Sequence, residues 1–157
     1  MFAQDGQEDL SAGRRLLTTI SQLGKEWKFS LEFQPQTLTT GCAEFLHFKR
    51  GGNDFAPSFY TTCPNSNKWR VHFTGSHAIG HVVDLPNTAV VGSWNQYEYT
   101  QKKIGSRYYT IISVNGLEQY REETSGVPAA EFQNVELFVG SGAAGLGAIR
   151  SIVVQNL

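Results

Sequence analysis

Five polar side chains that could bind a ligand lie close together in residues 45–54. They are His47, Lys49, Arg50, Asn53 and Asp54. Imidazole, guanidinium, amide and carboxylate groups together offer both donors and acceptors, which suits a ligand rich in hydroxyl groups. The same residue types are typical of a solvated strand that runs into a turn, because Asn and Asp side chains bond the local backbone there. The pair Gly51-Gly52 favours that turn, so a binding edge and a plain hairpin both stay open.

A second group of polar and aromatic side chains follows along the chain. It contains Asn65, Trp69, Arg70 and His72. An indole ring offers a flat apolar surface that can stack on the C–H face of a sugar, while its N–H reaches a partner at the rim. Trp69 alternates with Val71 and Phe73, which predicts a core position, whereas Arg70 and His72 alternate onto the opposite face. Trp69 is therefore either a core residue or a stacking platform.

The two other tryptophans differ in their alternation. Trp27 shares its period with the apolar residues of the segment KEWKFSLEF, which predicts a core position. Trp94 alternates with Gln96 and Glu98. It either caps the edge of the core or stands exposed, so it is a second candidate for ring stacking.

Metal and catalytic chemistry have weaker signals. His77 and His81 are four residues apart, which on a strand separates them by about 13 Å, too far for one zinc ion. A Ca²⁺ ion bound through Asp54 or Asp84 and backbone carbonyls is an alternative. No carboxylates show the alternating spacing that puts the acid and nucleophile of a sandwich glycosidase about 5 Å apart, and neither a G-x-S-x-G motif nor a P-loop occurs. We expect no metal site, no cofactor and no catalysis.

The elements that position these residues are predicted to be short β-strands. The segment 27–33 alternates apolar and polar side chains, and similar runs recur to the end of the chain. Asn115-Gly116 joins two such runs and predicts a type I′ hairpin. Only residues 10–23 could hold a short helical turn or two. About ten to thirteen strands at this spacing predict an all-β fold, a two-sheet antiparallel β-sandwich.

Length and composition restrict the class of protein further. The chain of 157 residues is predicted to form one domain, 1–157, with 1–13 as a loose N-terminal arm or a short edge segment. A net charge of −1 gives no reason to expect a nucleic-acid partner. No apolar run reaches the length of a membrane span, and the N-terminus does not read as a signal peptide. Cys42 and Cys63 either form a disulfide or are two small buried hydrophobes.

The order of landmarks in the second half resembles a known superfamily. Trp94 opens a strand, a hairpin closes on Val114-Asn115-Gly116, and the segments FQNVEL (132–137) and GAIRSIVV (147–154) follow. This order is similar to the C-terminal half of concanavalin A-like jelly rolls, which include galectin-like and laminin G-like domains. The resemblance covers roughly residues 25 to 157 and implies a jelly-roll sandwich. It implies little about function, because this fold hosts lectins, adhesion modules and glycosidases.

The galectin-like resemblance gives the first polar segment a specific meaning. Leu46-His47-Phe48-Lys49-Arg50 begins like the galectin strand that carries sugar-binding side chains, and Asn65 followed by Trp69 looks similar to the later part of that site. The resemblance implies a non-catalytic lectin for galactose-type sugars. We therefore predict one ligand site made of His47, Arg50, Asn53, Asn65, Trp69, Arg70 and His72.

These expectations extend to partners and location. We expect glycans of glycoproteins or glycolipids as ligands, no membrane insertion, an extracellular location, and a homo-oligomer that supplies avidity for weakly bound sugars. The alternative is an adhesion module of the laminin G-like type, in which the polar cluster is ordinary surface and a sheet face binds another protein.

Overall fold

The computed structural model describes most of the chain. The described residues are 1–10, 13–37, 43–50, 53–60, 70–73, 81–86, 90–123, 131–140 and 146–157, with the backbone alone for 53–60, His72, Phe73 and His81. Their regular structure is almost entirely β, as the sequence predicts. None of the helical structure in these residues has the length and apolar character needed to cross a membrane.

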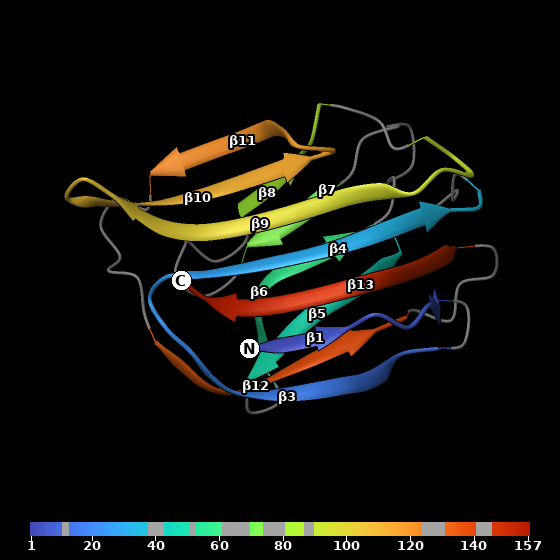
Figure 1. Cartoon of the computed structure of the whole chain (residues 1–157), viewed down its shortest axis with the longest axis horizontal. Helices are drawn as coiled ribbons and strands as arrows, with labels where there is room; N and C mark the ends of the chain where they lie inside the picture. The colour runs from blue at the N-terminus through green and yellow to red at the C-terminus, as the bar shows by residue number, and fades with distance from the viewer. Residues whose placement is uncertain are drawn as a thin grey trace.

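Thirteen described strands form two antiparallel sheets. The strands are β1 (Phe2–Gln4), β2 (Glu8–Asp9), β3 (Arg15–Leu23), β4 (Trp27–Pro35), β5 (Glu44–Arg50), β6 (Asn53–Tyr60), β7 (Arg70–Phe73), β8 (His81–Asp84), β9 (Asn95–Ile104), β10 (Arg107–Val114), β11 (Leu117–Glu123), β12 (Phe132–Val139) and β13 (Gly147–Asn156). The front sheet has the order β1-β13-β4-β9-β10-β11, with β2 also on β13, and the back sheet has the order β3-β12-β5-β6-β7-β8. Figure 1 shows the front sheet lying over the back sheet, which is the predicted β-sandwich.

Aromatic side chains of β4 and β5 join the two sheets. Alternate residues of β4 point into the core, as its period of two predicts. Trp27 and Phe29 of the front sheet meet Phe48 of the back sheet edge to face, with ring centroids 5.7 and 5.4 Å apart. Phe33 stacks on Phe45 at 4.6 Å. Such pairs contribute about 0.5–1.5 kcal/mol each beyond the burial of their area, so β4 and β5 fix how the sheets face each other.

Phe45 corrects one detail of the predicted alternation. Regular alternation along residues 45–49 would place Phe45 on the outer face with His47, but the Phe45 side chain is buried in the core. The reason is a β-bulge between Glu44 and Leu46, where β5 pairs with β6. A bulge inserts one extra residue and changes the face of the side chains before it, so Phe45 and Leu46 both reach the interior.

The N-terminal region is more ordered than a loose arm. Phe2–Gln4 and Glu8–Asp9 pair with β13, and Leu10 is fully buried. This is the edge-segment alternative, favoured because the sandwich supplies a free strand edge and an apolar site for these residues. Residues 15–23 form β3 and no helical turn, because their β-branched side chains pair well against β12.

Two local irregularities have visible causes in the sequence. The hairpin at Asn115-Gly116 has φ values of 50° and 77°, which confirms the predicted turn with two left-handed residues. Asn115 also accepts a hydrogen bond from the Gln96 amide at 2.8 Å, so the turn is tied to β9. The alternation of apolar residues in the segment EFQNVELF is interrupted at Asn134, which has φ 54°.

Gly147 is a position where the fold has no room for a side chain. Its φ is 121°, and a Cβ atom there would collide with the carbonyl oxygen of Gln34 on the neighbouring strand β4. We expect Gly147→Ala to lower the free energy of unfolding by at least about 3 kcal/mol, because it adds backbone strain to a steric clash. Urea denaturation measures this.

Gly105→Ala is the matched control for this variant. Gly105 also has a positive φ, 64°, but nothing lies within 4 Å of its Cβ position. We expect it to cost only about 1–2 kcal/mol, the price of a left-handed Ala. Equal losses of unfolding free energy in the two variants would show that the close approach of β13 to β4 does not contribute to the cost of Gly147→Ala.

Buried tyrosines predict a loss of stability in alkali. Burial raises the pKa of Tyr99 to about 12 and raises that of Tyr97 further. Because the unfolded chain ionises near pH 10, the stabilising effect of the neutral folded form is complete below that pH and is lost as the pH rises toward 12. Urea titrations between about pH 8 and pH 11 should show a decline approaching 1.4 kcal/mol per pH unit for each tyrosine.

The decline should be weaker in Tyr97→Phe/Tyr99→Phe. An unchanged slope in the double variant would contradict the assignment to these two phenols.

Candidate functional site

The back sheet aligns residues of its six described strands in one cross-strand row. The row runs Leu16, Phe138, His47, Ser58, His72 and Val82. Directly opposed residues of paired strands occupy the same face of a sheet. Phe48 and Val71, the chain neighbours of His47 and His72, are buried in the core, so the row lies on the outer face. His47 and His72, predicted for one site, therefore share one face of one sheet.

A second polar row accompanies the first on this face. It passes through Glu44, Tyr60, Arg70 and Asp84. Arg70 is two residues before His72 on β7, so both positions lie on the outer face, as the sequence predicts. Glu44 links the two rows, because its Oε2 lies 3.4 Å from Nδ1 of His47. We call the two rows together the back face.

His47 is buried, which corrects its predicted exposure. Only 1% of its side chain is exposed, and its ring stacks on Phe138 with centroids 5.2 Å apart and planes 6° apart. Lys49 Nζ lies 5.8 Å from the centroid of the same Phe138 ring. The alternation gave the correct face, but it could not show that β12 supplies an aromatic partner there. His47 is placed to orient its neighbours on the back face rather than to present its edge to solvent.

Arg70 is held in one orientation by Asp84. Its Nε donates to Oδ1 at 2.8 Å and its Nη2 donates to Oδ2 at 3.1 Å, a bidentate pair across β7 and β8. These hydrogen bonds hold the pKa of Arg70 above its ordinary value. Because both Asp84 oxygens accept from Arg70, a Ca²⁺ ion at Asp84 would have to displace this pair. The arrangement fixes a planar cation at the rim of the back face.

The other predicted site residues are only partly placed. Arg50 pairs with Asn53 across the turn between β5 and β6. The Arg50 side chain is exposed at the end of β5 and follows the alternation of Phe48, opposite to His47, so Arg50 does not belong to the back face. Asn65 and Trp69 lie outside the described residues, as do both cysteines.

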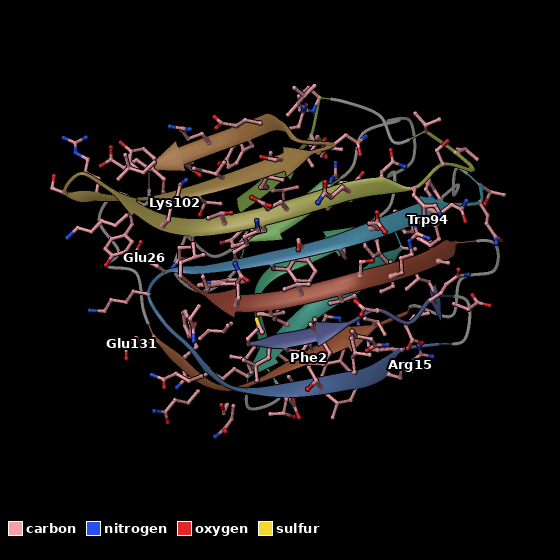
Figure 2. The ribbon with its side chains drawn as sticks, viewed as in Figure 1. Phe2, Arg15, Glu26, Trp94, Lys102 and Glu131 are labelled. Carbon is pink, nitrogen blue, oxygen red and sulfur yellow. The ribbon has the colours of Figure 1, made fainter. Side chains whose placement is uncertain are left out.

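The front sheet carries an aromatic and charged cluster that the sequence indicated only through Trp94. Trp94, labelled in Figure 2, is half-buried, and the guanidinium carbon of Arg150 lies 4.0 Å from its ring centroid. Arg150 Nε donates to Glu32 Oε2 at 2.6 Å, and the Ser151 hydroxyl donates to the same oxygen at 3.2 Å. Because Arg150 occupies a face of the indole, Trp94 is less open to a stacking ligand than its alternation suggested.

A shallow polar hollow lies beyond this cluster. Its volume is about 100 Å³, and it is lined by Gln96, Glu98, Ser113 and Gly116. The alternation of Trp94 with Gln96 and Glu98 indicated from the sequence that these residues share one face of β9. Ser113 and Gly116 join them only because β10 pairs with β9. Glu98 forms an ion pair with Lys28, so the hollow holds no uncompensated charge from this carboxylate.

The carboxylates near the β10–β11 hairpin are engaged in ion pairs or hydrogen bonds. Glu118 accepts from Arg121 at 2.7 and 2.9 Å, and Glu123 accepts from Arg107 at 2.7 Å. The hydrogen bond from Arg121 lowers the pKa of Glu118. Within the described ranges, no three His, Cys, Asp or Glu side chains gather as metal ligands would.

The fold and the two outer faces define a class: an antiparallel β-sandwich of the jelly-roll type. No protein-family model matches the sequence, and no curated protein sequence matches it significantly. Similarity is found among solved structures. The heptameric SAP-like pentraxin from Limulus polyphemus aligns with a TM-score of 0.65 and 11% identity, over 99% of this chain and 76% of its own.

A fungal lyase and one domain of a bacterial arabinanase share the fold. The endo-β-1,4-glucuronan lyase from the fungus Trichoderma reesei aligns with a TM-score of 0.58 and 14% identity, over 99% of this chain and 79% of its own. Domain 4 of the extracellular GH43 arabinanase AbnA from Geobacillus stearothermophilus, in complex with arabinotriose, aligns with a TM-score of 0.54 and 14% identity, over 90% of this chain and 65% of its own. At these identities the alignments show the fold alone.

The Arg70–Asp84 pair should contribute little to stability. Its side chains are 30% and 36% exposed, so solvent screens their attraction. A double-mutant cycle with Arg70→Gln and Asp84→Asn should give a coupling energy below about 1 kcal/mol by urea denaturation. The exposed pair Arg107–Glu123 on the front sheet is the matched control. A coupling above about 2 kcal/mol would mean that the pair holds β7 on β8 instead of forming an accessible rim.

Proposed function

We propose that this protein is a carbohydrate-binding lectin that recognises glycans on the back face without chemical turnover, with galactose-type sugars as the first class to test. The observation that carries the proposal is the pair of cross-strand rows on β5–β8. They bring His47, His72 and Arg70 to one face of one sheet. Strands hold such groups more rigidly than loops do, which a weakly binding hydroxyl ligand needs.

The chemistry of the back face suits a sugar. Its positions combine a guanidinium, an imidazole, a carboxylate and the hydroxyl residues Ser58 and Tyr60, so these residue types include both the donors and the acceptors that sugar hydroxyls require. The sequence predicts Trp69, which directly precedes Arg70, as the apolar platform for the ring. The arabinanase domain in complex with arabinotriose supports this choice, since in that protein the same fold accompanies an oligosaccharide.

A small sugar buries little surface, so affinity per site should be modest and multivalency important. We extend the proposal to an extracellular protein of galectin-like or laminin G-like ancestry, a single domain over residues 1–157 that presents several copies of its site. Binding without catalysis is also part of the proposal, because the ion pairs described above engage Glu118 and Glu123.

A glycan array followed by calorimetry with the best soluble oligosaccharide tests the proposal. We expect Arg70→Ala, His72→Ala and Trp69→Ala each to weaken binding by roughly 10- to 100-fold, the effect of losing one charged or stacking contact. Gln96→Ala/Ser113→Ala, in the front-sheet hollow, is the matched control and should bind normally. His47→Ala is a poor probe, because removing a buried ring also weakens the fold.

The possible results separate the alternatives. Loss of binding in the control, with normal binding in the back-face variants, would move the site to the front sheet. If no glycan on the array is bound and an extracellular-matrix protein is captured, the laminin G-like adhesion module is favoured. Release of oligosaccharide products from a bound glycan would show an enzyme.

A further inference from the structure

A β-bulge in β13 brings two polar neighbours to the outer face of the front sheet. The pairing of β13 with β4 shifts register between Arg150 and Val153, and Ser151 within this bulge has φ 52°. A non-glycine residue with such a left-handed φ is strained, and strained positions concentrate where proteins hold ligands. In a regular strand Arg150 and Ser151 would point to opposite faces. Here both donate to one carboxylate, Glu32 of β4.

The guanidinium of Arg150 is held in one orientation but only partly used. Its carbon lies 4.0 Å from the centroid of the Trp94 ring, and its Nε donates to Glu32 at 2.6 Å. Within the described part of the chain its two Nη groups donate no hydrogen bond, and the side chain is 39% exposed. The two Nη groups form a planar fork that matches the two oxygens of a carboxylate. Arg150 therefore offers an anion a fixed and accessible fork.

A second exposed arginine of the front sheet shows the contrast. Arg121 donates to Glu118 from both Nε and Nη2, at 2.9 and 2.7 Å, so one carboxylate occupies a whole edge of its guanidinium. Glu32 instead contacts Arg150 through one oxygen and one nitrogen, and it shares that oxygen with Ser151. The interaction with Glu32 orients Arg150 without occupying its fork.

The row that contains Arg150 leads across the front sheet to the polar hollow. Arg150 is opposite Glu32, and Glu32 is opposite Gln96, so the row crosses β13, β4 and β9. Figure 1 shows these three strands side by side in the front sheet. Gln96 lines the hollow, whose volume of about 100 Å³ gives room for about three groups of the size of a water molecule. Since neighbouring strands are about 4.8 Å apart, β13 and β9 are separated by roughly 10 Å.

We propose that this part of the front sheet is a second binding site, which takes an oligosaccharide that carries a carboxylate. The fork of Arg150 receives the carboxylate of one sugar unit, and Gln96 and Ser113 in the hollow bind hydroxyl groups of the next unit. The separation of roughly 10 Å is longer than one sugar ring, so the ligand has at least two units. The site goes beyond the lectin proposal, because it lies on the opposite outer face of the sandwich and takes a charged sugar.

The charges around the site favour one acidic unit beside a neutral one. Arg150 is paired with Glu32, and Lys28 is paired with Glu98. A carboxylate at Arg150 gains charge-assisted hydrogen bonds. A second carboxylate in the hollow would lie beside Glu98, and such a juxtaposition of like charges is unfavourable. A sugar chain with an isolated acidic unit therefore fits the site better than a run of acidic units.

Calorimetry with cellobiouronic acid, a glucuronate unit linked to glucose, tests the site. We expect the wild type to bind it and to bind its methyl ester, which keeps both rings and removes the charge, at least about 10-fold more weakly. Arg150→Gln should weaken binding by roughly 10- to 100-fold, the effect of losing hydrogen bonds to a charged group. Arg150→Lys should weaken it almost as much, because an ammonium group has no planar fork. Gln96→Ala/Ser113→Ala should weaken it roughly 2- to 10-fold.

Arg121→Gln is the matched control for Arg150→Gln. It removes an exposed arginine of the same sheet that already binds Glu118 through two atoms, so it should bind cellobiouronic acid normally. Circular dichroism checks that each variant is folded, and if Arg150→Gln unfolds, Gln96→Ala/Ser113→Ala decides the test. No binding by the wild type, equal affinity for the methyl ester, or normal binding in the folded Arg150→Gln would overturn the proposal.

The second site and the lectin site on the back face can fail separately. Arg70→Ala should leave the affinity for cellobiouronic acid unchanged, and Arg150→Gln should leave the affinity for a neutral galactose-type sugar unchanged. A protein that binds the acidic disaccharide through Arg150 but binds no neutral glycan would sink the lectin proposal and keep the second site. A protein that binds only the neutral glycan, through Arg70, would do the reverse.

Discussion

The contact between the aromatic residues of β4 and β5 is the interaction on which the rest of this structure depends. Trp27 and Phe29 meet Phe48 across the two sheets, and Phe33 stacks on Phe45. These rings can reach each other only when one set of faces is turned inward. The polar residues between them on each strand are then turned outward, because successive side chains of a strand alternate. The packing of the core therefore determines which side chains lie on the outer faces.

The back face follows from that constraint together with strand order. β5, β6, β7 and β8 are consecutive both in the chain and in the sheet, so each polar position meets its counterpart on the next hairpin strand. His47 and Arg70 acquire their surroundings in this way, His47 from Phe138 and Glu44, and Arg70 from Asp84. A face built by hairpins between neighbouring strands keeps its register when its exposed side chains change, which suits a recognition surface.

The two sheets differ in where their charged side chains lie and in how these are paired. On the front sheet, ion pairs join Glu32 to Arg150, Glu98 to Lys28 and Glu118 to Arg121. Such exposed pairs contribute little to stability, but they protect the edge at β11 and leave its outer face nearly neutral. On the back sheet, Arg70 pairs with Asp84, whereas β3 carries no charge after Arg15.

The sequence by itself determined the fold class, most strands and the main turn. Alternation placed Trp27 in the core, and Asn115-Gly116 specified its hairpin. These are local properties, since the period of a strand and the φ angles of a turn depend on residues close together in the chain.

The tertiary structure alone decided the surroundings of the candidate site. Alternation turned His47 to the correct face, but Phe138, which stacks on it, comes from a strand about 90 residues away, and no local pattern pairs the two. The bulge that turned Phe45 inward, and the hollow formed by β9 and β10, likewise depend on register between strands. A strand's own residues decide which way each side chain points, whereas only the packed fold decides what it meets there.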